Sequence, residues 1–221
     1  SLPMFQAQVF TLYPEVFPGP LSKGLYGKAL SNKLWNLNVI NIRDAATDKH
    51  KTVDDTPYGG GTGMLLKADV LANALDQKVK KGERVFYLSP KGKKFDQKLA
   101  QDLSKEKSIS LICGHFEGVD ERVLTTRNIE EISVGDYVLS GGETAALVVL
   151  DSILRLLPGV LGNDKSSLDE TFENGLLEYP QYTKPQIWEE KSVPDVLLSG
   201  DHSKIKDWRL SQSEAITRDR R

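Results

Sequence analysis

The sequence has little cysteine, little net charge and no long apolar run, and each absence removes a class of protein. One cysteine in 221 residues allows no internal disulfide framework, which favours a reducing compartment. No apolar stretch is long enough for a transmembrane helix, and the N-terminus lacks a signal-peptide pattern. We therefore expect a cytoplasmic protein with no membrane partner. The 39% hydrophobic content is enough to bury one large core or two modest ones.

Metal-binding patterns are also missing. No Cys/His spacing of the zinc type occurs, and the three histidines, His50, His115 and His202, are scattered without a supporting carboxylate pattern. We therefore predict no metal site from the sequence.

The charge is unevenly distributed along the chain. The formal net charge is −2, so bulk charge does not indicate a nucleic-acid-binding protein. However, ten basic residues face four acidic ones between Lys78 and Lys107, and the tail His202–Arg221 is basic again. Such blocks are compatible with separate phosphate-facing surfaces and, more simply, with solvated helix faces. No helix-turn-helix or stacking-sheet signature appears, so DNA is not an expected partner.

Strand and helix patterns alternate through the first two thirds of the chain. The predicted strands are Phe5–Leu12, Leu37–Asn41, Val85–Leu88 (ended by a turn at Ser89–Gly92) and Ile109–Cys113. The predicted helices are Leu21–Asn32, Lys67–Val79, Phe95–Leu103 and Thr144–Leu157. This alternation predicts an α/β domain with a mostly parallel sheet, whose ligand lies at the carboxyl ends of the strands.

The organisation along the chain has three predicted parts. Residues 1–160 carry the α/β pattern, 161–175 have a linker's composition, and 176–221 indicate a small, mainly helical domain. Within the first part, Asp44–Gly63 has few apolar residues and is predicted to be a long functional loop.

Three glycines punctuate the segment Ile132–Ala146. We predict a strand broken at Gly135, resuming through Tyr137–Leu139 and turning at Gly141–Gly142 into a helix. Phosphate is the usual ligand of such a turn, but Glu143 lies in the first helical turn and no phosphate-loop lysine is present. A neutral or cationic ligand is therefore favoured.

Several longer motifs occur together in order. They are Asp54–Met64, Cys113–Arg122, Ile132–Ala146, Pro158–Gly162, Gly175–Pro185 and Leu197–His202. In these motifs the chain resembles the bacterial tRNA (guanine-N1)-methyltransferases of the SPOUT superfamily, from about Phe5 to Thr217. The resemblance implies a deep C-terminal trefoil knot, which composition alone would never suggest because knots are rare. It also implies a homodimer, with sites shared between subunits, that methylates N1 of the guanine at position 37 in the tRNA anticodon stem-loop.

The resemblance implies S-adenosylmethionine as the methyl donor, a sulfonium cation without phosphate. The cofactor-binding positions carried over by motif are Leu88, Ser89, Pro90, Gly114, Val134, Gly135, Asp136, Tyr137, Val138, Leu139, Gly141 and Gly142. Their backbone groups are expected to pair the adenine edge, since a buried polar heterocycle needs partners. The family is associated with magnesium, but no carboxylate cluster in the sequence marks a site for it.

The reaction needs a general base for the N1 proton and a cation near O6. The resemblance places Arg155 in the second role and a linker carboxylate in the first. Relatives commonly have Asp-Ser-Phe where this chain has Asp169-Glu-Thr-Phe172, so the base position falls on Glu170, with Asp169 as the alternative.

The substrate-binding positions implied by the resemblance are Phe116, Glu117, Tyr58 and Asp201. A carboxylate at Glu117 would accept hydrogen bonds from guanine and not from adenine, whereas Asp201 is equally compatible with a helix cap. His115 replaces an arginine common in relatives. Two other hypotheses remain open: a non-catalytic RNA-binding relative with the same fold, and a nucleotide-phosphate enzyme using the same glycine turns.

Overall fold

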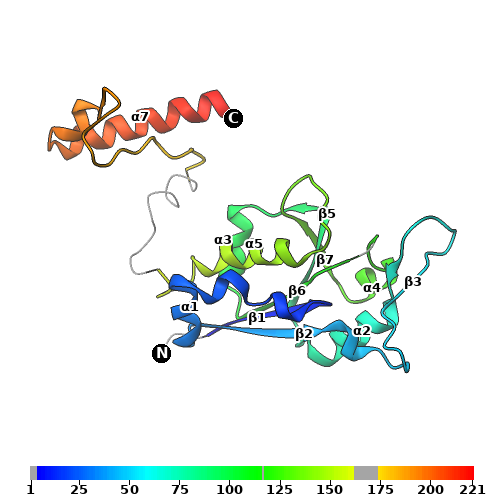
Figure 1. The fold of residues 1–221 in the computed structure, drawn as a ribbon. Helices are drawn as coiled ribbons and strands as arrows, with labels where there is room; N and C mark the ends of the chain where they lie inside the picture. Colours follow the sequence, from blue (N-terminus) through cyan, green and yellow to red (C-terminus); the bar gives the residue numbers. More distant parts are fainter. Residues whose placement is uncertain (1–3, 116, 162–173) are drawn as a thin grey trace. The chain divides into compact units, whose positions relative to one another are not determined.

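The computed structural model describes residues 4–115, 117–161 and 174–221 (Figure 1). The chain divides into two compact units, Ser1–Gly162 and Asn163–Arg221. The predicted linker, residues 161–175, lies outside the described residues apart from its ends.

The first unit is built on a five-stranded sheet in the order β2-β1-β6-β5-β7. Every neighbouring pair of strands in it is parallel, which confirms the predicted α/β class. The strands are β1 (Phe5–Thr11), β2 (Trp35–Asn41), β5 (Arg84–Lys94), β6 (Ser108–Ile112) and β7 (Glu130–Ser133). A separate antiparallel pair, β3 (Asp54–Asp55) with β4 (Leu65–Leu66), flanks the glycine-rich part of the predicted long loop.

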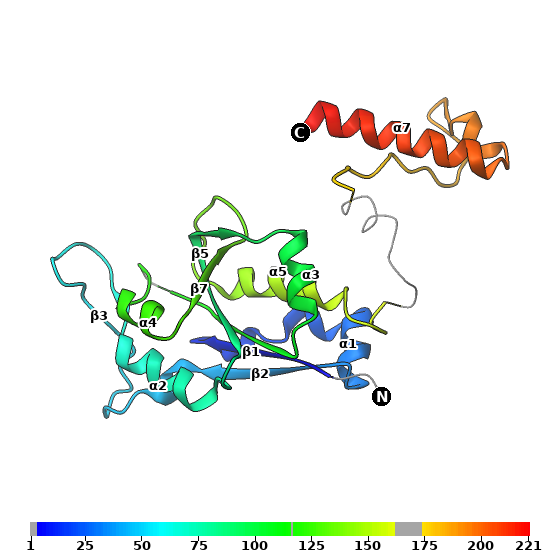
Figure 2. The same ribbon diagram turned by 180° about the vertical axis from the view of Figure 1, so that it is seen from behind.

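Helices connect these strands and cover the sheet (Figures 1 and 2). The α-helices of the first unit are α1 (Gly24–Ser31), α2 (Ala68–Lys78), α3 (Gln97–Ser104), α4 (Glu121–Thr126) and α5 (Glu143–Leu154). Short 3-10 helices cover Pro14–Val16, Gly19–Ser22 and Ile42–Ala45. Sequence analysis did not predict α4, which begins where the Asp120 side chain accepts a hydrogen bond from the Arg122 amide (2.9 Å).

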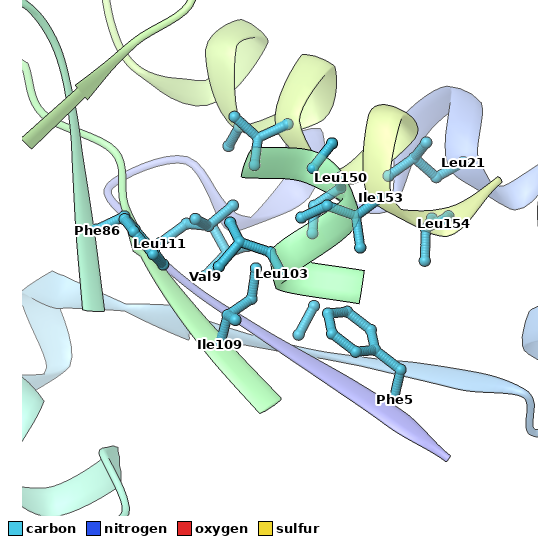
Figure 3. Packing of buried hydrophobic residues seen from close by; sticks show 14 of the residues in the cluster. Phe5, Val9, Leu21, Phe86, Leu103, Ile109, Leu111, Leu150, Ile153 and Leu154 are labelled. Atoms are coloured by element: carbon cyan, nitrogen blue, oxygen red, sulfur yellow. The ribbon is translucent and has the colours of Figure 1, made fainter. Parts of the chain in front are cut away.

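Two apolar clusters lie on the two faces of the sheet. Because side chains alternate along a strand, Val9 of β1 belongs to one cluster and its neighbour Phe10 to the other. Figure 3 shows the cluster that holds Val9, where Leu103 of α3 and Ile153 of α5 pack towards the strands. The helix α5 is apolar along most of its length and is therefore largely buried, which fixes its N-terminus relative to the sheet.

The strand β5 is longer than predicted. It continues through Ser89–Gly92, where we expected a turn, and its register against β7 shifts between Leu88 and Lys93. A Cβ atom at Gly92 would lie 2.5 Å from the Ile132 amide nitrogen, so glycine here lets the two backbones approach closely. The predicted turn is therefore wrong: the residues form an irregular stretch within a continuing strand.

The strand β7 does not resume after Gly135. The Ser133 hydroxyl accepts a hydrogen bond from the Gly135 amide (3.1 Å) and donates one to the Gly135 carbonyl (2.9 Å). These bonds close a turn that ends β7, and Tyr137–Leu139 then form an exposed loop. The prediction of a second strand segment there is wrong.

The second unit contains one long helix and a small hairpin. The helix α7 (His202–Arg220) follows a 3-10 helix at Asp195–Leu198, and β8 (Ile187–Trp188) pairs antiparallel with β9 (Lys191–Ser192). Trp208 lies on the half-buried face of α7, and its ring packs against Tyr182 with centroids 6.5 Å apart. Across the described residues, no helix combines the length and the apolar character needed to cross a membrane.

Candidate active site

A cavity of about 420 Å³ opens where the carboxyl ends of β6 and β7 meet the irregular middle of β5. Three glycine-bearing segments that follow or interrupt these strands form its wall. Of the predicted cofactor-binding residues, Leu88, Ser89, Pro90, Gly114, Val134, Gly135, Tyr137, Val138, Leu139, Gly141 and Gly142 line it. Asp136 is the one member of that set that does not line the cavity.

Two glycines allow the cavity segments to touch. The Gly142 amide donates a hydrogen bond to the Gly114 carbonyl oxygen (2.9 Å). A Cβ atom at Gly142 would lie 2.8 Å from the Cys113 Cα atom, and one at Gly114 would lie 2.6 Å from the Tyr87 ring. Side chains at these positions would push the segments apart, so the shape of the cavity depends on glycine at both.

Glu143 is the first residue of α5 and is buried. Its Oε2 atom accepts a hydrogen bond from the Thr11 hydroxyl (2.8 Å), and its Oε1 atom pairs with His115 Nε2. The Tyr13 ring packs against His115 with centroids 4.9 Å apart. As predicted, a carboxylate occupies the positive end of the helix dipole, but Thr11 and His115 bind it and it does not line the cavity. His115 therefore has the carboxylate partner that the sequence pattern did not indicate.

Two buried titratable groups next to the cavity are held neutral. Burial raises the pKa of the Cys113 thiol well above its ordinary value, and the nearby Glu143 carboxylate raises it further. Burial raises the pKa of Tyr87 to about 12, with a smaller contribution from the negative charge of Glu131. At neutral pH neither group is ionised, so Cys113 is not a thiolate nucleophile.

The glycine-rich loop approaches the cavity through Glu117. The exposed Glu117 side chain lines the cavity, and its amide donates a hydrogen bond to the Met64 carbonyl oxygen (2.9 Å). Gly63 packs against the Glu117 side chain and has a φ of +92°, so a larger residue there would be strained and would clash. Tyr58, at the tip of this loop, is fully exposed and does not line the cavity, and Phe116 lies outside the described residues.

Of the predicted catalytic residues, Arg155 is the one within the described residues, and it does not line this cavity. Arg155 caps the C-terminal end of α5, whereas the cavity lies at the N-terminal end of that helix. The helix has 12 residues, so about 18 Å separates its two ends. Glu170 and Asp169 lie outside the described residues.

Asp201 lies in the second unit and is the N-cap of α7. Its side chain accepts a hydrogen bond from the Lys204 amide (3.1 Å). Within the described parts of the chain, no group of three or more His, Cys, Asp or Glu side chains is arranged to hold a metal ion.

Sequence analysis missed Tyr87 as a cavity residue and Glu131 as its neighbour. Tyr87 lines the cavity, and the ladder between β5 and β7 places Glu131 directly opposite it. Tyr87 lies in the apolar predicted strand Val85–Leu88, whose composition gives no indication of a cavity residue. The available signal was its position directly before the predicted ligand-binding residues Leu88–Pro90.

Comparison with known proteins agrees with this geometry. Residues 5–221 match the model of the family described as tRNA (Guanine-1)-methyltransferase TrmD. The chain is 81% identical over 218 residues to a tRNA (guanine-N(1)-)-methyltransferase of Pelagibacter ubique, covering 99% of this chain and 96% of that protein. It is 58% identical over 217 residues to the protein of the same name from Bartonella tribocorum, covering 98% of this chain and 93% of that protein. The chain therefore belongs to the tRNA (guanine-1)-methyltransferase family.

Proposed function

We propose that this protein transfers a methyl group from S-adenosylmethionine to N1 of a guanine in tRNA, at position 37 beside the anticodon. The observation that carries the proposal is the glycine-lined cavity, which has Glu117 in its wall. The names of the relatives from Pelagibacter ubique and Bartonella tribocorum support the reaction, since both are tRNA (guanine-N(1)-)-methyltransferases.

The cavity suits a nucleoside-sized cofactor. Its volume of about 420 Å³ falls within the range of small-molecule sites, about 300–1,000 Å³. The backbone of Val134–Leu139 would pair the adenine edge, and Leu139 would flank the ring. The methyl group of S-adenosylmethionine, attached to a cationic sulfur, would be the electrophile.

The protein's own groups would handle the proton and the charge of the guanine. Glu117 would accept hydrogen bonds from N1–H and the exocyclic amine, which adenine cannot offer together. Glu170, or Asp169 in its place, would remove the N1 proton. Arg155 would stabilise the negative charge that develops on O6.

We propose that a homodimer is the catalytic unit. Arg155 and the cavity lie at opposite ends of α5, about 18 Å apart, which is too far for one chain to bring both to the same base. A second copy that supplies Arg155 and the linker carboxylate would complete the site.

The remaining assignments follow the family. Residues 1–160 would form the knotted SPOUT catalytic domain, 161–175 a mobile linker, and 176–221 a tRNA-binding domain that includes Asp201. The protein would act in the cytoplasm, where its tRNA substrate is found. No residue is proposed as a magnesium ligand.

A methyl-transfer assay tests the proposal. The purified protein, radiolabelled S-adenosylmethionine and a tRNA transcript with guanine at position 37 should give labelled tRNA, whereas a transcript with adenine there should not. Glu170→Gln should abolish turnover and leave donor binding intact, and Asp169→Asn should retain activity. If only Asp169→Asn abolishes turnover, Asp169 is the base. Binding of donor and tRNA without any transfer would instead identify a non-catalytic relative.

A further inference from the structure

The cavity wall contains the side chain of Tyr87, which is 7% exposed as a whole and whose hydroxyl group lies near the glycine-bearing part of the wall. Cβ atoms built at Gly114 and Gly118, both in the cavity wall, would lie 2.7 and 3.7 Å from the Tyr87 oxygen. The Tyr87 hydroxyl is therefore positioned to contact a ligand in the cavity.

A carboxylate residue, Glu131, lies opposite Tyr87 on the neighbouring strand. The parallel ladder pairs Tyr87 with Glu131, so both side chains leave the same face of the sheet on strands about 4.8 Å apart. The Oε2 atom of Glu131 is buried and has no hydrogen-bond partner within the described part of the chain. The negative charge of Glu131 contributes to the raised pKa of Tyr87, which is consistent with this proximity.

The basic side chains near this end of the cavity do not pair with Glu131: Arg84 and His115 are bound by other carboxylates. Glu130, the neighbour of Glu131, forms two hydrogen bonds with Arg84 (3.0 and 2.8 Å), and Glu143 is bound by Thr11 and His115. Lys91 lines the cavity but is exposed, and no ion pair between described residues joins it to Glu131. A partly buried carboxylate without a compensating charge favours a cation in the adjacent space.

We propose that Glu131, which lies beside Tyr87 and outside the cavity wall, makes the Tyr87 end of the cavity favour the positive charge of the methyl donor. The Tyr87 hydroxyl contacts the ligand, and Glu131 acts through its charge, so that the sulfonium of S-adenosylmethionine binds more tightly than the neutral thioether of S-adenosylhomocysteine. Glu131 is thus a residue that discriminates donor from product. This inference rests on the proposed function, because it requires the cavity to bind the methyl donor.

Calorimetric titration of both ligands into the wild-type protein and Glu131→Gln tests the inference. Glu131→Gln should lower the affinity for S-adenosylmethionine about tenfold, equivalent to about 1.4 kcal/mol, and leave that for S-adenosylhomocysteine within about twofold. Glu130→Gln is the matched control, because it removes the same charge one residue away on the opposite face and should leave the affinity ratio unchanged. Tyr87→Phe should lower the affinities for both ligands by similar factors, because the lost hydroxyl contact is common to both.

Each other outcome counts against the inference. If Glu131→Gln weakens both ligands equally, Glu131 recognises a group common to both or acts only on the structure, and the sulfonium assignment is wrong. Unchanged affinities for both ligands in Glu131→Gln also overturn it. If Glu131→Gln does not fold, the wild-type protein supplies the contrast: sinefungin, which carries an amine in place of the methylated sulfur, must bind more tightly than S-adenosylhomocysteine. Should the wild-type protein bind none of these ligands, the proposed function fails instead.

Discussion

Replacing Gly142 with alanine should disrupt the contact between two cavity segments. The new Cβ atom would lie 2.8 Å from the Cys113 Cα atom and 3.0 Å from the Gly114 amide nitrogen, and neither backbone atom can rotate away. Relief requires the segments to separate, which lengthens the 2.9 Å bond from the Gly142 amide to the Gly114 carbonyl. Overpacking of this kind costs about 1–3 kcal/mol, which lowers the Tm of a domain of this size by about 2–12 °C.

In Gly142→Ala, the affinity for the ligand should fall by more than the loss of folding stability alone would cause. We expect the affinity of Gly142→Ala for S-adenosylhomocysteine, measured by calorimetry, to fall at least about tenfold, because the displaced segments form the cavity wall. Gly82→Ala is the control: Gly82 has a φ of +82°, no atom within 4 Å of a built Cβ, and no place in the cavity wall. It should lose about 1–2 kcal/mol through backbone strain and keep its affinity. Wild-type affinity in Gly142→Ala would refute the dependence of the cavity on this close approach.

Three further predictions concern the dimer, the second unit and the buried thiol. In a shared-site homodimer, Arg155→Ala and Gly142→Ala should each be nearly inactive at low donor concentration. A randomly reassociated equal mixture should recover about one quarter of wild-type activity, because about half of its dimers are heterodimers with one intact site each; no recovery would contradict shared sites. Asp201→Ala should lower the free energy of unfolding by about 1 kcal/mol in denaturant titrations through loss of the cap bond to Lys204, and a much larger loss of tRNA affinity would instead indicate an RNA contact. Folding raises the pKa of Cys113, so its contribution to stability is complete below about pH 8.5 and declines as the pH rises further. Iodoacetamide should label Cys113 slowly in the folded protein at pH 8 and rapidly in guanidinium chloride, and rapid labelling of the folded protein would show that the thiol is accessible.

The parallel sheet could be predicted because its signals are local. Strands such as Phe5–Leu12 and helices such as Lys67–Val79 show their period within a few residues, and the structure places them within one or two residues of the prediction. The convergence of the three glycine-bearing segments could also be predicted from the sequence, because the carboxyl ends of parallel strands meet at one edge of a sheet.

The errors arose where distant residues decide the local structure. Ser89–Gly92 has the composition of a turn, but β5 pairs with β7 on both sides of it, at Leu88 and at Lys93, so the strand continues past it. Tyr137–Leu139 has the composition of a strand, but hydrogen bonds between Ser133 and Gly135 end β7 first. Local sequence patterns do not show whether strand pairing or side-chain hydrogen bonds will override the local preference.

The site was predicted only in part for the same reason. Glu143 pairs with Thr11, 132 positions away in the sequence, and Glu131 meets Tyr87 only through the register of two strands. Neither contact leaves a periodic trace in the sequence. The positions of Glu170 and Arg155 come from motif resemblance, and no spacing argument would have found them.

The central claim is that the glycine-lined cavity accepts a cationic methyl donor and excludes phosphorylated nucleotides. Parallel calorimetric titrations with S-adenosylmethionine and with ATP test it most directly. We predict saturable one-to-one binding of S-adenosylmethionine, at least about tenfold weaker binding in Gly142→Ala, and no measurable heat from ATP. Tight binding of ATP without binding of S-adenosylmethionine would contradict the claim.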